Sequence, residues 1–221
     1  MEMGFSWYNG VLMREVFVVD RIKASAIGAV AVAGALLIPL AAQAQAIAVF
    51  GGGYGETCWR AALASTFIHM DSAVEEAHWK ADSIRACDDA ISGSALDRRD
   101  LASTYVNRSI LEMSRENYAV AEKNLNSALK LMPMLAEAHV DLGSTMINMQ
   151  KYDEGVRETE LGLQLNSKEP QRAYYNLGIA YEYLGNLQKA YDSYKQAALL
   201  DPKWQDPKDQ MARFVVQPIN R

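Results

Sequence analysis

The sequence has few of the residues that build metal centres and redox sites. Two cysteines, Cys58 and Cys87, and three histidines, His69, His78 and His139, occur in 221 residues. They form no C-x-x-C or H-x3-H pattern, whereas a zinc site needs three or four such ligands at close spacing. We therefore expect no metal and no cofactor.

The chain also lacks a surplus of positive charge. It has 22 Lys and Arg against 27 Asp and Glu, a formal net charge of −5, and no basic run offsets this locally. Such a chain repels a phosphate backbone, so we expect no nucleic acid among its partners. Its 14 Gly and 6 Pro are few for a disordered protein, and 50% of the residues are hydrophobic. A globular, helical chain with a real core is expected.

Signs of catalysis are missing as well. No G-x-S-x-G motif is present. The glycine cluster at 51–55 resembles a dinucleotide-binding fingerprint only superficially, because Glu56 occupies the last glycine slot and no β-α-β pattern follows. We predict that the protein is not an enzyme.

Residues 24–42 form an uncharged, mostly apolar run, and the small residues Ala42-Gln43-Ala44-Gln45-Ala46 follow it. Basic residues precede the run, and two overlapping A-x-A sites end it, which is typical of a secretory signal peptide. We predict a signal peptide over residues 1–46 and a mature chain that begins at Gln45 or Ile47. The alternative is an uncleaved membrane anchor, since the run is about long enough to span a bilayer.

In both interpretations the basic residues stay inside, and everything after residue 46 lies outside the cytoplasm. The expected location is the periplasm or the medium, with a membrane-anchored form as the second choice. After cleavage we expect no membrane insertion. Met13 is an alternative start, because the stretch before it is long for the basic region of a signal peptide.

A repeat of about 34 residues runs through the C-terminal half. Ala128, Gly162 and Ala197 lie 34 and 35 residues apart. The same steps link Ala121 to Gly155 and Ala190, and Tyr105 to His139 and Tyr174. Within a unit, apolar residues recur at spacings of three and four, which predicts two amphipathic helices.

The third unit shows how each pair of helices is built. Gly185-Asn186 predicts the turn between the two helices, and Asp201-Pro202 predicts the end of the second. Gly178 and Ala190 are small where bulky residues surround them, as expected if the helices cross closely there.

These residues resemble the tetratricopeptide repeat. The third unit matches all eight positions of the family pattern: Tyr174, Leu177, Gly178, Tyr181, Ala190, Tyr194, Ala197 and Pro202. The second unit departs from the pattern at Thr159 and Ser167. The first unit places Arg108, Ser109 and Glu112 where Leu, Gly and an aromatic are usual, so its first helix is expected to face an atypical neighbour.

The resemblance implies an all-α fold, a right-handed α-α superhelical solenoid. We expect a Gly-rich leader at 47–55, capping helices within 56–92, and a C-terminal cap and tail at 205–221. The three units span 102–135, 136–170 and 171–204. Cys58 and Cys87 lie on the two capping helices, and an exported chain meets an oxidising compartment, so we expect a disulfide between them. The alternative is two buried, reduced cysteines.

The family further implies a protein or peptide partner, bound in the concave groove that the first helix of each unit lines. The family's groove positions correspond to Val106, Asn107, Ile110, Met113, Val140, Asp141, Ser144, Ile147, Arg172, Tyr175, Asn176, Ile179, Glu182 and Tyr183. Asn107, Asp141 and Asn176 are equivalent, so they would form a polar ladder for a peptide backbone or would bond the neighbouring repeat.

Tyr175 and Tyr183 have no evident packing role unless the C-terminal tail folds back over them. The function expected is that of an adaptor or assembly factor in the cell envelope. A small helical-scaffold enzyme, a ligand-binding protein and a membrane-anchored part of a secretion complex are the alternatives. The oligomeric state stays open.

Overall fold

The computed structural model describes residues 6–8, 11–18, 55–65, 73–93 and 96–218. Nine helices and three strands lie in these residues. The helices are α1 (Glu56–Ser65), α2 (Ala73–Ser92), α3 (Arg98–Met113), α4 (Tyr118–Leu131), α5 (Ala136–Asn148), α6 (Tyr152–Gln164), α7 (Pro170–Tyr183), α8 (Leu187–Leu200) and α9 (Asp206–Met211). The strands are β1 (Ser6–Tyr8), β2 (Val11–Val18) and β3 (Phe214–Pro218).

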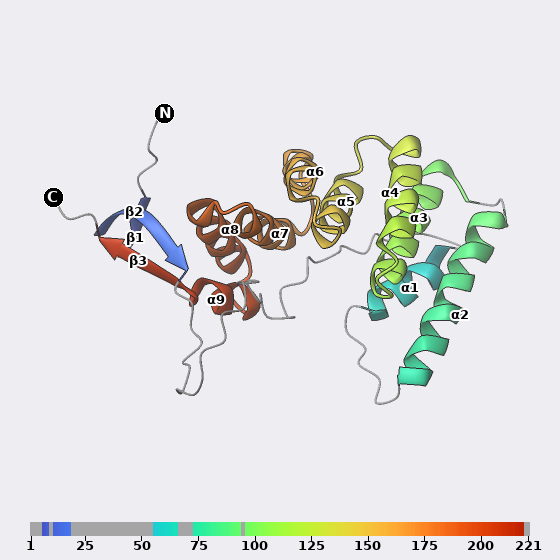
Figure 1. Cartoon of the computed structure of the whole chain (residues 1–221). Coiled ribbons are helices and arrows are strands. Elements are labelled where there is room, and N and C mark those ends of the chain that lie inside the picture. Colours follow the sequence, from blue (N-terminus) through green and yellow to red (C-terminus); the bar gives the residue numbers. More distant parts are fainter. Residues whose placement is uncertain (1–5, 9–10, 19–54, 66–72, 94–95, 219–221) are drawn as a thin grey trace.

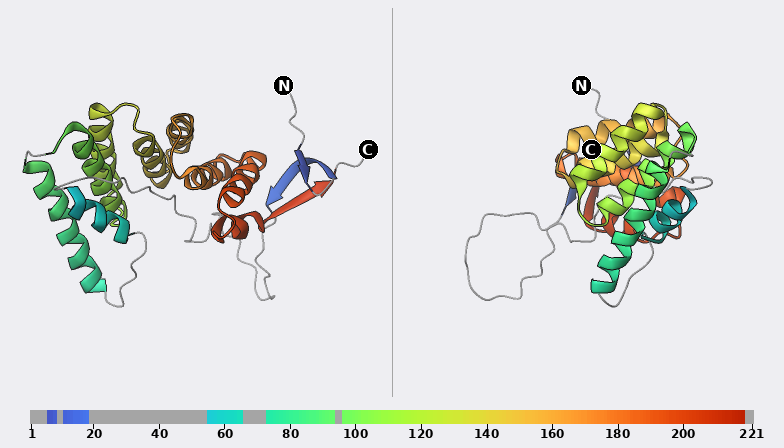
Figure 2. Two further views of the ribbon diagram at one scale, coloured as in Figure 1. Left: turned by 180° about the vertical axis from the view of Figure 1, so that it is seen from behind. Right: turned by 90° about the vertical axis from the view of Figure 1, so that its right-hand side faces the viewer.

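The helices stack in chain order into an elongated solenoid (Figure 1). Each helix from α3 to α8 contacts the next one along the chain, and α1 and α2 both pack on α3. The view from behind in Figure 2 shows the same order, with α1 and α2 at one end and the strands at the other. The predicted all-α solenoid is confirmed for this helical body.

The turn between the two helices of each unit repeats with the same period as the sequence. Glu116, Gln150 and Gly185 adopt positive φ angles of 61°, 62° and 75°. At each turn the next residue's amide returns to a carbonyl five residues earlier, as from Asn186 to Tyr181. This is the Schellman arrangement that ends a helix by satisfying its last carbonyls. The predicted turn at Gly185-Asn186 is confirmed.

The two helices of the third unit cross closely at Gly178. A Cβ atom at this position would lie 2.5 Å from ring carbons of Tyr194, which is fully buried on α8. Contacts that short require an atom to move. Glycine at 178 is therefore a packing requirement, as the sequence predicted.

Arg108 explains why the first unit departs from the family pattern. Its side chain lies 2.7 Å from Asp88 of α2 and 3.3 Å from Glu112, and Glu112 accepts a hydrogen bond from Asn117. Lys80 of α2 donates to the carbonyl of Ser114 at the end of α3. The neighbour of α3 at Arg108 is thus a capping helix that contacts it through charged side chains, which agrees with the expectation of an atypical partner.

Cys58 and Cys87 form a disulfide that joins α1 to α2, with 4.7 Å between their Cα atoms. Both cysteines are fully buried, and they pack with Ala62, Ile84 and residues of α3. The bond therefore fastens the two capping helices together directly on the first repeat.

The C-terminal segment continues past α9 into a strand that the sequence did not predict. β3 pairs antiparallel with β2, and β2 pairs with β1, so the sheet order is β1-β2-β3. The strands β1 and β2 fall within the predicted signal peptide. The apolar run at 24–42 and the leader at 47–54 lie outside the described residues. Within the described part of the chain, no helix combines the length and hydropathy of a membrane span.

His139 links three elements through its imidazole ring. Nδ1 lies 2.8 Å from Glu158 of α6, and Nε2 lies 2.9 Å from the carbonyl oxygen of Pro133 in the α4–α5 turn. A carbonyl and a carboxylate both accept, whereas a neutral imidazole donates from one nitrogen only. The ring therefore makes both bonds as an imidazolium. The hydrogen bond to Glu158 raises the pKa of His139 above 6.5, and burial opposes this.

Because the folded pKa is raised, the stabilisation by His139 is complete below pH 6.5 and is lost as the pH rises through the folded pKa. We expect the free energy of unfolding to fall over that interval by about 1.5 to 3 kcal/mol, the worth of a hydrogen bond to a charged group. Urea unfolding at a series of pH values measures it. His139→Gln and Glu158→Gln are the controls, in which the free energy of unfolding should lose this dependence on pH. A dependence as large as in the unaltered chain would contradict the charged His139–Glu158 pair.

Candidate interaction groove

The predicted groove residues lie on α3, α5 and α7, the first helices of the three units, which contact one another in order. Ten of them are buried: Val106, Asn107, Ile110, Val140, Asp141, Ser144, Ile147, Tyr175, Asn176 and Ile179. Met113, Arg172 and Glu182 are partly buried, and Tyr183 is exposed. The described structure thus gathers these residues on one side of the solenoid but does not leave them open to solvent.

Asn107, Asp141 and Asn176 occupy equivalent places, one on each of these helices. All three are fully buried, and none is without an interaction partner. Buried amide and carboxylate groups need hydrogen bonds, because burying them unpaired is costly. We call these three residues, one in each repeat beside apolar neighbours such as Val106 and Val140, the polar seam.

The Ser144 hydroxyl on α5, also on this side, has no hydrogen-bond partner among the described residues, and this residue is fully buried. An unpaired buried polar group costs about 1 to 3 kcal/mol. The Ser144 hydroxyl lies one helical turn from Asp141, in the central repeat.

Tyr175 is a core residue. Its ring centre lies 4.8 Å from that of Trp204 and 5.6 Å from that of Tyr194. Burial, with the nearby carboxylate of Asp206 as the next cause, raises the pKa of Tyr175 to about 12. Tyr175 therefore has the packing role that was expected only if the C-terminal tail folds back over it, and the C-terminal segment does so.

Glu182 holds that C-terminal segment in place. Its carboxylate accepts from Arg213 at 2.5 Å and from the Tyr194 hydroxyl at 3.1 Å. The Glu182 side chain is only 6% exposed. Burial raises the pKa of the Tyr194 hydroxyl, and the charge of Glu182 adds to this. A predicted groove position is thus occupied by the chain's own terminus.

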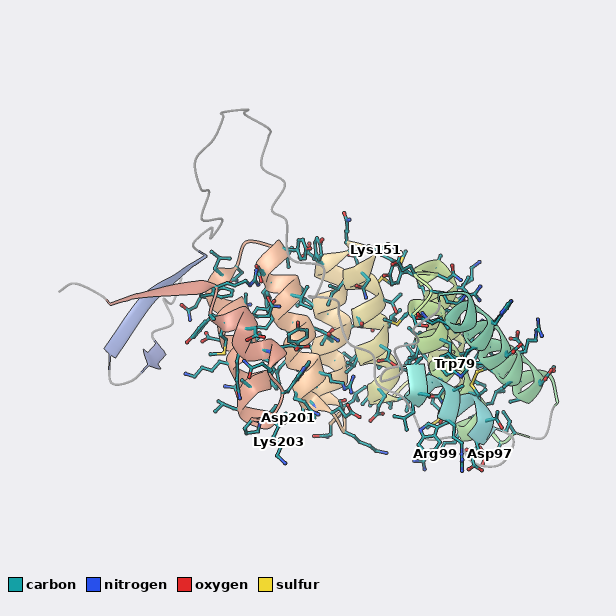
Figure 3. All side chains as sticks on the ribbon, turned by 90° about the horizontal axis from the view of Figure 1, so that it is seen from below. Trp79, Asp97, Arg99, Lys151, Asp201 and Lys203 are labelled. Atoms are coloured by element: carbon teal, nitrogen blue, oxygen red, sulfur yellow. A yellow bond between two sulfur atoms is a disulfide. The ribbon has the colours of Figure 1, made fainter. Side chains whose placement is uncertain are left out.

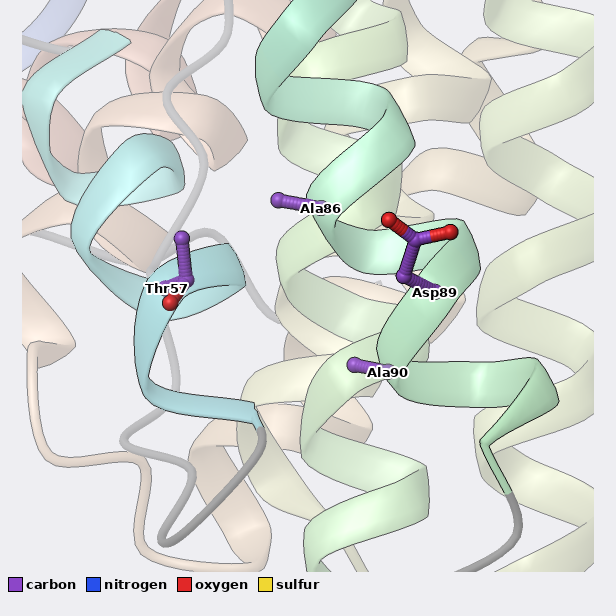
Figure 4. A pocket seen from close by; sticks show the side chains of 4 residues that line it. All are labelled: Thr57, Ala86, Asp89 and Ala90. Atoms are coloured by element: carbon purple, nitrogen blue, oxygen red, sulfur yellow. The ribbon is translucent and has the colours of Figure 1, made fainter.

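The other end of the groove side is covered by α1. The Cys58 sulfur lies 3.7 Å from the carbonyl oxygen of Thr104 on α3, and a Cβ at Gly55 would lie 2.9 Å from the Thr104 hydroxyl. A shallow recess between α1 and α2 is lined by Thr57, Ala86, Asp89 and Ala90 (Figure 4). One carboxylate, one hydroxyl and two methyl groups offer no set of convergent chemical groups there.

Tyr183 stands at the rim and stacks on Tyr152, with ring centres 4.5 Å apart and planes 7° from parallel. Its exposed fraction is 45%. Figure 3 shows charged side chains, among them Lys151 and Lys203, projecting outward from the ribbon. The Tyr152–Tyr183 pair, which we call the rim, therefore offers exposed aromatic surface, whereas the residues of the seam are buried.

Three participants in this arrangement escaped the sequence analysis of the groove: Tyr152, Arg213 and the contact of Trp204 with Tyr175. Trp204 packs against the hydrophobic cluster around Tyr194. No sequence pattern marks Arg213 as the partner of Glu182. In the described residues no three His, Cys, Asp or Glu side chains are grouped so as to hold a metal ion.

The two tyrosines provide a matched pair of substitutions. Tyr175→Ala removes a fully buried ring and should lower the free energy of unfolding by about 3 kcal/mol or more. Tyr183→Ala removes a half-exposed ring in one stacking contact and should cost at most about 1 kcal/mol. Urea unfolding compares the two, and equal losses would contradict the placement of Tyr175 in the core.

A family model for the tetratricopeptide repeat matches residues 172–203, which comprise most of α7 and all of α8. A crystal structure of MamA is similar, with a TM-score of 0.52 at 21% identity, over 65% of this chain and 82% of that one. MamA from Desulfovibrio magneticus RS-1 gives 0.51 at 19% identity, over 72% and 84%. At such identities the likeness shows the fold alone.

A search of curated proteins gives no match. The repeat in α7 and α8, the period that α3–α6 share with it, and the shared solenoid fold agree with one another. Residues 172–203 are thus a tetratricopeptide repeat, and they lie within a helical solenoid of the fold that such repeats build.

Proposed function

We propose that the chain is an exported protein–protein interaction module that binds an extended peptide of a partner protein along the seam of Asn107, Asp141 and Asn176. The coarser part of this function, a protein-interaction scaffold, follows from the fold and family. The observation that carries the finer part is the buried Ser144 hydroxyl, which lies beside Asp141 without a hydrogen-bond partner among the described residues.

The seam has the chemistry that a peptide backbone requires. An asparagine amide both donates and accepts, and a carboxylate accepts, so a side chain of this kind can exchange its present partner for a main-chain N–H or C=O. One such group per repeat suits an extended segment that runs along the solenoid axis. The apolar residues beside the seam, Val140 and Ile147, suit alternate apolar side chains of the same segment.

The Ser144 hydroxyl supports a ligand in the central repeat. In the unbound chain this buried group costs free energy, because it has lost water and gained no partner. A backbone group of a bound peptide would remove that cost once neighbouring side chains move aside to admit it. The elements α1 and α9 cover the two ends of the groove side, so the proposed ligand lies chiefly over α5, with its side chains reaching the Tyr152–Tyr183 rim.

Export is supported by the sequence and by the cysteines. The A-x-A sites after the apolar run predict cleavage before Gln45 or Ile47. A disulfide such as Cys58–Cys87 persists in oxidising compartments and is rare in the cytosol. We therefore place the proposed function in the periplasm or the medium.

Peptides selected by display on the purified chain test the proposal. Ser144→Ala should weaken their binding about five- to tenfold, since one hydrogen bond is worth about 1 kcal/mol. Ser109→Ala is the matched control: Ser109 is equally buried but already donates to the Val106 carbonyl, so this variant should keep the affinity. Equal affinities of the two variants would contradict the seam as the binding site.

A photo-crosslinking amino acid at Tyr183 gives an independent readout of the same site. Tyr183 lies at the rim, whereas Leu199 is 62% exposed on α8, the second helix of its unit. The selected peptides should crosslink to position 183 and not to position 199. Crosslinking from position 199 alone would place binding on the other side of the solenoid.

A further inference from the structure

We infer that β3 of the exported chain accepts a strand from a partner protein, at the edge that β2 occupies in the structure. This inference rests on the export part of the proposed function. It concerns a different surface from the seam of α3, α5 and α7, since β3 lies beyond α9 at the C-terminal end (Figure 1).

The pairing of β2 with β3 defines the geometry of a strand-binding site at the edge of β3. β2 pairs with it in antiparallel register, from Val18 opposite Phe214, through Val16 opposite Val216, to Met13 opposite Pro218. The strand β2 also lies against α8. The structure thus shows directly that an extended segment fits between this edge and the last long helix.

Export separates the two strands. β2 precedes the apolar run at 24–42, and β3 follows it. If the signal peptide is cut after Ala44 or Ala46, β2 leaves with it. If the run stays as an anchor, β2 remains on the cytoplasmic side, about 30 Å of hydrocarbon away from β3. Paired strands are about 4.8 Å apart, so in neither case does β2 cover β3 in the exported chain.

β3 stays anchored when β2 is gone, because its first residues are bound to the solenoid. Arg213 is held by Glu182, and the Phe214 ring centre lies 5.8 Å from that of Tyr191 and 6.1 Å from that of Tyr194. None of these contacts involves β2. The exported chain therefore presents β3 at a fixed place beside α8. The N–H and C=O groups on the edge that β2 covers in the structure are then unpaired.

An unpaired strand edge binds extended segments through main-chain hydrogen bonds. β2 gives the chemistry of a fitting partner: residues 11–18 read Val-Leu-Met-Arg-Glu-Val-Phe-Val, which is rich in β-branched and aromatic residues. The partner that binds this edge is an apolar, strand-forming segment of another exported protein, which pairs antiparallel to β3. In the precursor, β2 protects the same edge from aggregation.

A synthetic peptide with the sequence of residues 11–18, fluorescently labelled, is the probe. Fluorescence anisotropy should show that it binds the chain purified after export. It should bind the full-length chain retained in the cytoplasm at least about tenfold more weakly, because the tethered β2 competes at high effective concentration. A scrambled peptide is the control for sequence. No binding to the exported chain would overturn the inference.

Two proline variants locate the site. Neighbouring residues of a strand direct their N–H groups to opposite edges, so Val215 and Val216 face different edges of β3. At least one of Val215→Pro and Val216→Pro should abolish peptide binding while helical circular dichroism is kept. Peptide binding that survives both substitutions would overturn the inference.

Two measurements keep this inference separate from the seam. N-terminal sequencing should find Gln45 or Ile47, and an unprocessed chain confined to the cytoplasm would overturn the export on which both proposals rest. Ser144→Ala should leave binding of the 11–18 peptide unchanged. Size-exclusion chromatography should show that the exported chain is not a dimer held through β3; a dimer dispersed by the peptide would assign the edge to a second copy instead.

Discussion

The close crossing of two helices in each repeat is the constraint on which the rest of the structure depends. At Gly178 the neighbouring atoms leave no room for a Cβ, because the Tyr194 ring lies against the α7 backbone. The second repeat shows the same feature at Gly143, Gly155 and Gly162, where a Cβ would come within 2.1 to 2.5 Å of a side-chain atom on the facing helix. Close crossings fix the pitch of the solenoid and hence the spacing of α3, α5 and α7.

That spacing has a functional consequence. Because α3, α5 and α7 contact one another, the residues that face along the groove side are buried and their polar groups form a seam. The two ends of this side are covered by the chain itself, through α1 with its disulfide and through the segment that Glu182 and Trp204 hold. The central repeat and the open edge of β3 are thus the two distinct surfaces proposed for partners.

The sequence predicted best those structural features that depend on residues close together in the chain. The turn at Gly185, the small residue at 178 and the atypical neighbour of Arg108 each follow from residues within one repeat or at a known pattern position. The packing of Tyr175 could not be decided from the sequence, because its partners Trp204 and Asp206 lie where the third unit ends and a tail without a repeat pattern begins. The pairing of β2 with β3 joins residues about 200 apart, and no local pattern encodes such a contact.

The substitution Gly178→Ala tests the close crossing of the helices most directly. Two effects of this substitution predict changes of opposite sign in the free energy of unfolding. In an exposed helix, alanine stabilises by about 1 kcal/mol relative to glycine. Here the added methyl group would collide with Tyr194, and overpacking of this kind costs about 1 to 3 kcal/mol. Urea unfolding should therefore show a chain less stable than the unaltered one, with part of the loss recovered by adding Tyr194→Leu. A more stable Gly178→Ala chain would contradict the account.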